Sequence, residues 1–146
     1  MEIKPRYEGP PIVDVEDGGD CTAAFVRQRE RLAGTLATLG EGEWATPSRC
    51  ERWTVQDVVS HLVTVNQFWR YSIESGLAGE PTQLLVGFDP KATPAALVEA
   101  AGTPAPAETL AQLVDASAAL CEVVSGLDGA GWATVAAAAG LAACGK

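Results

Sequence analysis

The stretch that decides the fold is TVQDVVSHLVTVNQFW, residues 54–69. Thr54 followed three residues later by Asp57 is typical of a capping box, with Asp in place of the usual Glu. We therefore predict a helix that begins at Thr54, runs to about Ser75 and is closed by Gly76. Its apolar residues recur at helical spacing and form one stripe: Val55, Val58, Val59, Leu62, Val65, Trp69 and Ile73.

Two polar residues of this helix stand out. His61, the one histidine of the chain, projects about 85° from the centre of the apolar stripe. It shares its side of the helix with Asp57, Thr64 and Phe68, a position from which a helix can direct a ligand into the gap between neighbours in a bundle. Asn66 projects into the stripe, so its amide must find a partner or line a wet cavity.

The rest of the sequence predicts more helices and no strands. Helical periodicity appears over residues 21–39, 93–101 and 107–125. Asp20 can cap the first of these helices, Gly40 and Gly42 can end it, and Thr93-Pro94 can open the second. Residues 43–53 and 102–106 read as loops, and the connection over residues 76–94 is long enough to be functional or mobile. The expected fold class is all-α.

Length and charge limit the organisation and the partners. A chain of 146 residues with 47% hydrophobic content is one domain with a buried core. We place an extended, flexible N-terminal arm at residues 1–19, the domain at 20–134 and an irregular tail at 135–146. The net charge of −9 argues against nucleic acid and anionic membranes as partners. We find neither a secretory signal nor a membrane span, and expect a cytoplasmic protein.

The four cysteines form no Cys-x-x-Cys pair. In a cytoplasmic setting, Cys21, Cys50, Cys121 and Cys144 are expected to be reduced and mostly buried. Cys50 precedes the helix start at Thr54, where a thiolate can be stabilised, so a reactive role there is the alternative.

Two short segments are similar. Residues 39–46 (LGEGEWAT) match residues 127–134 (LDGAGWAT). Both follow a helix, and we expect Gly to stop the helix and Trp44 and Trp132 to fold back on the core. Trp53 and Trp69 are likewise expected to be core anchors rather than ligand stackers.

Several of these residues also carry a family resemblance. The chain resembles the actinobacterial maleylpyruvate isomerase-like, mycothiol-dependent family in its N-terminal metal-binding domain, over about residues 25–134. The resemblance rests on Arg31-Leu32, on residues 44–50 (WATPSRC), on residues 53–62 (WTVQDVVSHL) and on Phe68-Trp69, with a softer match at residues 79–97. Arg52 stands where the family more often has Gly.

The resemblance implies a DinB-like four-helix bundle and a divalent metal, with zinc as the expected ion. His61 would be the metal ligand from the second helix, and a carboxylate and a histidine of the last helix would complete the site. Mycothiol would be the cofactor thiol, and a small molecule would undergo isomerase or transferase chemistry. In this chain an alanine-rich run follows Val135 where the family has that last helix, so we expect a C-terminally truncated bundle.

Two functions follow from this comparison. As an enzyme, the chain would need His61, with Asp57 one turn earlier, to bind metal together with groups that the sequence does not identify. As a truncated domain, it would be inactive or impaired and would act as a helical binding or self-association module, because exposed apolar helix faces favour homo-oligomers or partners. Without the family, His61 reads as a hydrogen-bonded packing residue.

Overall fold

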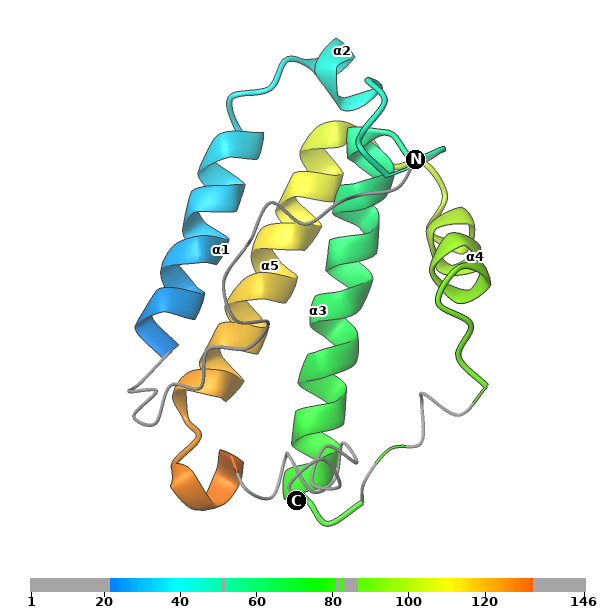
Figure 1. Ribbon diagram of the computed structural model, residues 1–146. Coiled ribbons are helices and arrows are strands. Elements are labelled where there is room, and N and C mark those ends of the chain that lie inside the picture. The colour runs from blue at the N-terminus through cyan, green and yellow to red at the C-terminus, as the bar shows by residue number, and fades with distance from the viewer. Residues whose placement is uncertain (1–21, 51, 81, 83–86, 133–146) are drawn as a thin grey trace, which may run out of the picture.

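The computed structural model describes residues 22–50, 52–80, 82 and 87–132 (Figure 1). Within these ranges the secondary structure is helical, apart from one isolated β-bridge between Pro47 and Thr54. The helices are α1 (Thr22–Leu36), α2 (Glu41–Trp44), α3 (Val55–Leu77), α4 (Ala92–Ala101) and α5 (Pro106–Ser125). The prediction of an all-α fold is confirmed. The N-terminal arm, Asp20 and the tail after residue 134 lie outside the described residues.

The three long helices form the body of the domain (Figure 1). α5 packs against both α3 and α1, and α4 lies against α3. Figure 1 shows that α3 and α5 run in the same direction, because α4 and its flanking segments return the chain to the end of the bundle where α3 starts. α1 runs in the opposite direction. The N-termini of α3 and α5 therefore lie at the same end of the bundle, beside α2.

The start of α3 is as predicted. The Thr54 hydroxyl accepts a hydrogen bond from the backbone N–H of Asp57 at 3.2 Å, and the Asp57 carboxylate accepts from the Thr54 backbone N–H at 2.8 Å. These two bonds form the capping box, which satisfies backbone donors that a helix start leaves free. The end lies two residues beyond the predicted Ser75, because α3 continues to Leu77 and Gly76 is buried within it.

The core has two parts along α3 and α5. One cluster comprises Leu36, Trp44, Val59, Val63 and Leu113, and the other comprises Ile73, Leu120 and Val124. Trp44 is buried as predicted, at 4% exposure. Trp132 is 46% exposed, so the prediction that it folds back is wrong; Leu127 packs against the second cluster in its place.

The buried face of α3 differs from the predicted stripe. Buried positions include Gln56, Ser60 and Asn66, whereas Trp69 is 38% exposed and is no core anchor. The polar residues are buried because α5 supplies partners: the Gln56 side-chain amide donates to the Thr109 hydroxyl, and the Asn66 amide donates to the Ser117 hydroxyl at 2.9 Å. The expected partner of Asn66 is thereby confirmed.

Helix boundaries were the weakest part of the sequence prediction. α1 ends at Leu36, before the predicted Leu39. Gly40 does not only stop a helix: its N–H donates to the Glu43 carboxylate at 2.7 Å and begins the one-turn helix α2 within the predicted loop. α4 begins at Ala92 and not after a Thr93 cap, because the Asp89 carboxylate accepts from the N–H groups of Lys91 and Ala92, both at 2.7 Å.

Candidate functional site

His61 lies on the side of α3 that faces away from the main core. At 100° per residue, the buried positions of α3 centre about 165° from His61. This differs from the predicted position at the edge of the core, and it follows from the rotation of α3 that brings Gln56, Ser60 and Asn66 against α5. The imidazole is nevertheless only partly exposed.

Trp53 covers the His61 ring. The two ring centroids lie 5.1 Å apart and the planes are inclined by 53°. Trp53 reaches this place because the segment before α3 folds back on itself. The Ser48 N–H donates to the Trp53 carbonyl at 2.9 Å, and the Val55 N–H donates to the Thr46 carbonyl at 3.0 Å. Trp53 was predicted to be a core anchor, but in the fold its ring contacts the imidazole of His61.

The environment of His61 favours a neutral imidazole with one ring nitrogen available to bind a ligand. Partial burial lowers the pKa of His61 through desolvation of the charged form. Its Nδ1 is buried, and no described residue forms a hydrogen bond with it. A buried polar atom of this kind is uncommon in proteins and needs an explanation such as an unseen water or ion. Neutral imidazole nitrogen is also the form that binds metals.

The residues expected beside His61 do not complete a donor set. The Asp57 carboxylate oxygen Oδ2 accepts from both the backbone N–H and the hydroxyl of Thr54, at 2.8 and 2.7 Å. The Thr64 hydroxyl donates to the Ser60 carbonyl at 3.3 Å. Phe68 packs edge-on against Trp69, with centroids 5.1 Å apart. Among the described residues, no group of three or more His, Cys, Asp or Glu side chains could hold a metal ion. This part of the chain fits one ligand and not a whole metal site.

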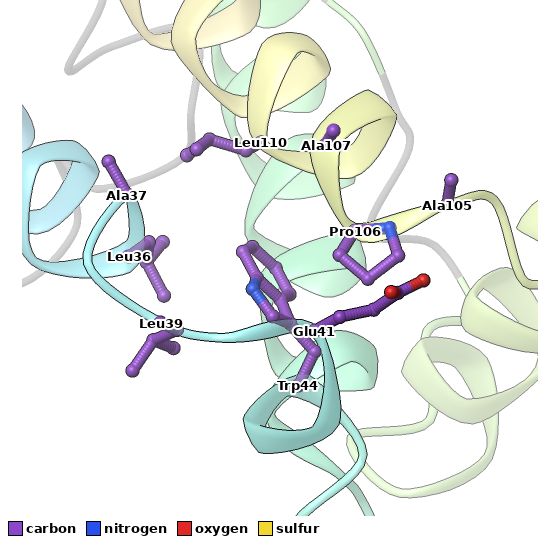
Figure 2. A pocket seen from close by; sticks show the side chains of 9 residues that line it. All are labelled: Leu36, Ala37, Leu39, Glu41, Trp44, Ala105, Pro106, Ala107 and Leu110. Atoms are coloured by element: carbon purple, nitrogen blue, oxygen red, sulfur yellow. The ribbon is translucent and has the colours of Figure 1, made fainter.

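Three cavities lined by described residues lie elsewhere on the domain. Figure 2 shows a cavity of about 430 Å³ between the end of α1, α2 and the start of α5, with the Trp44 ring between Leu36 and Pro106. Glu41 is the one charged residue of its lining. A second cavity, of about 480 Å³, lies between α1 and α5, and a third, of about 70 Å³, lies among α1, α3 and α5. His61 lines none of the three.

The cysteines differ from the expectation of buried thiols. Cys50 is exposed, and Cys121 is partly buried. Burial raises the pKa of the Cys121 thiol, an effect that the charge of Arg29 opposes. Cys21 and Cys144 lie outside the described residues, and within the described part of the chain no cysteine is close enough to His61 to form a donor cluster with two other side chains.

These observations define the class of the protein: it is an all-α bundle with a partly buried histidine on its longest described helix. The sequence matches the family model of the mycothiol maleylpyruvate isomerase N-terminal domain over residues 25–143. The chain therefore belongs to this family, and the DinB-like fold expected from the resemblance is confirmed with it. Comparison with curated proteins and with solved structures found no match. No described helix is long and apolar enough to cross a membrane.

Proposed function

We propose that this chain is the metal-binding domain of a mycothiol-dependent isomerase or transferase that acts on a small molecule in the cytoplasm, and that His61 is a metal ligand. Family membership over residues 25–143 supports the class of protein. The observation that carries the role of His61 is its buried Nδ1, which has no hydrogen-bond partner among the residues that the structure describes. Zinc is the proposed ion, because imidazole nitrogen is one of its usual ligands.

We further propose that the site is incomplete in this chain and that catalysis is impaired. Zinc sites normally use three or four protein ligands. The sequence has one histidine, and Asp57 is engaged by Thr54. A bound metal would supply a positive charge that deprotonates a coordinated thiol. A single imidazole does not hold an ion firmly enough for that task.

Calorimetric titration with zinc tests both parts of this proposal. The purified chain should bind zinc with a dissociation constant on the order of 1 mM, equivalent to about −4 kcal/mol. His61→Ala should remove this binding. Cys50→Ser is the matched control, because Cys50 is an exposed thiol that could itself take up zinc; this variant should behave like the unaltered chain.

Each half of the proposal can fail separately in this experiment. Stoichiometric binding at micromolar or lower concentrations, lost in His61→Ala, would show that the site is complete. Equal zinc binding in the unaltered chain and in His61→Ala would remove His61 from the ligand set.

The second candidate is a non-catalytic helical module that binds a partner or itself. Its support is the exposure of large apolar side chains on two helices: Leu32 on α1 is 37% exposed, and Trp69 and Tyr71 on α3 are 38% and 57% exposed. Exposed apolar surface of this kind favours association. Sedimentation analysis over a hundredfold concentration range tests it: a mass that rises with concentration in the unaltered chain, and not in Trp69→Lys, supports self-association, and a constant monomer mass rules it out.

A further inference from the structure

Arg29 of α1 carries a positive charge at the meeting point of three helices. Its guanidinium carbon lies 3.7 Å from the centroid of the Phe25 ring, so an aromatic side chain covers one face of the cation. A second contact is a long hydrogen bond, 3.5 Å, from Nη2 to the Asn66 side-chain oxygen. The Nε–H is buried and has no acceptor among the described residues. The planar edge of the guanidinium is therefore largely unsatisfied.

No described carboxylate forms an ion pair with Arg29. The one ion pair among the described residues joins Arg70 and Glu74 on the surface of α3. A guanidinium is always charged in proteins, and a partly desolvated charge is costly unless it is paired. In a chain of net charge −9, a cation without an acid partner indicates that the partner comes from outside the described residues.

A small cavity lies next to this cation. Its volume is about 70 Å³, enough for a group of a few heavy atoms such as a carboxylate. The polar residues of its lining are Gln28, Arg29, Asn66 and Ser117, and the rest are leucines. No described acidic residue lines it, whereas Glu30 and Glu122 line the larger cavity of about 480 Å³, which Arg29 also lines. The small cavity is thus the side from which an anion can approach.

We propose that Arg29, supported by Asn66, binds a small oxyanion in the 70 Å³ cavity among α1, α3 and α5. The planar edge of a guanidinium matches the two oxygens of a carboxylate, which can accept from Nε and from one Nη together. The Asn66 side chain is held by Ser117 and fixes the position of Nη2. This site is separate from His61 and does not depend on metal binding there.

Nuclear magnetic resonance of the arginine Nε–H groups tests the proposal on the full chain. Sodium acetate is added at constant ionic strength, with sodium fluoride as the compensating salt. The Nε–H signal of Arg29 should shift and saturate, with a dissociation constant on the order of 10 mM for one guanidinium–carboxylate pair in a partly exposed site. A parallel titration with inorganic phosphate distinguishes the ligand class: the salt that saturates at the lower concentration identifies a carboxylate or an inorganic oxyanion.

Matched variants locate the effect. Arg27→Gln removes an exposed charge from the same helix and should leave acetate binding within twofold of that of the unaltered chain. Arg29→Lys keeps the charge, loses the planar edge and should weaken binding about tenfold or more. If Arg29→Lys does not fold, the Arg29 signal of the unaltered chain still decides the matter. The proposal is wrong if that signal responds to neither salt, or if Arg29→Lys binds acetate as well as the unaltered chain does.

Discussion

Arg52 adopts a backbone conformation that an arginine rarely takes. Its φ is 67°, in the left-handed region that glycine enters freely and that L side chains enter at a cost. The Trp53 N–H donates to the Cys50 carbonyl at 3.1 Å, so residues 50–53 form a turn. Arg52 is the third residue of this turn, and turns with a positive φ at that position favour Gly there. The family resemblance also predicts Gly at this position.

Arg52→Gly should therefore stabilise the domain. The left-handed conformation costs a side-chain-bearing residue about 1–2 kcal/mol. Glycine avoids this cost and loses about 0.5–1 kcal/mol through the extra freedom of the unfolded chain. The net gain in unfolding free energy is about 0.5–1 kcal/mol. Arg52 is exposed, so the loss of its side chain adds little to the balance.

Urea unfolding followed by circular dichroism at 222 nm measures this gain. Arg52→Ala is the control, since it removes the same side chain and keeps the Cβ that causes the strain; its unfolding free energy should stay within about 0.5 kcal/mol of that of the unaltered chain. The reasoning is refuted if Arg52→Gly is no more stable than Arg52→Ala.

Three further outcomes follow from the fold. Thr54→Ala breaks the capping box and should lower the unfolding free energy by about 1 kcal/mol, which urea unfolding can measure. Leu113→Ala, at a position 2% exposed, should cost about 2–5 kcal/mol, whereas Val114→Ala, at 43% exposure, should cost about 0.5 kcal/mol or less; equal losses would contradict the assigned core. Iodoacetamide at pH 8 should modify the exposed Cys50 faster than Cys121. The raised pKa of the Cys121 thiol leaves less thiolate at that pH, and a higher pH is needed to form it. Peptide mass spectrometry measures the two modification rates.

Local sequence signals predicted the helices well where a cap was present. The capping box at Thr54 correctly predicted the start of α3. α5 begins at Pro106, one residue before the predicted start at Ala107. Other boundaries differ because the signals were assigned to the wrong residues: Gly40, predicted to end a helix, begins a one-turn helix, and Asp89 rather than Thr93 accepts from the first N–H groups of α4.

The face that α3 buries was not accessible from the sequence. Hydropathy places Trp69 inside and Gln56 outside, because it weighs each side chain alone. In the fold, the hydroxyls of Thr109 and Ser117 on α5 accept hydrogen bonds from the side-chain amides of Gln56 and Asn66. These partners stand about fifty positions further along the chain, and no periodicity within α3 signals them.

The candidate site could be predicted as far as a single residue. The motif around His61 singled out the imidazole, and partial burial, the Trp53 contact and the unpaired Nδ1 agree with a special role for it. The contact between Trp53 and His61 could not be predicted, because it depends on how the segment before α3 folds back on itself. The sequence likewise could not show that Arg29 forms no ion pair with a described carboxylate.

The most direct test of the central claim uses the fact that His61 is the one imidazole in the chain. Long-range ¹⁵N correlation spectra report Nδ1 and Nε2 without ambiguity of assignment, and zinc is added stepwise. The account predicts a gradual shift of one nitrogen signal in fast exchange, which saturates only near millimolar zinc. A new set of imidazole signals at one equivalent of zinc, in slow exchange with the first, would contradict it, because it would show a complete and tight metal site.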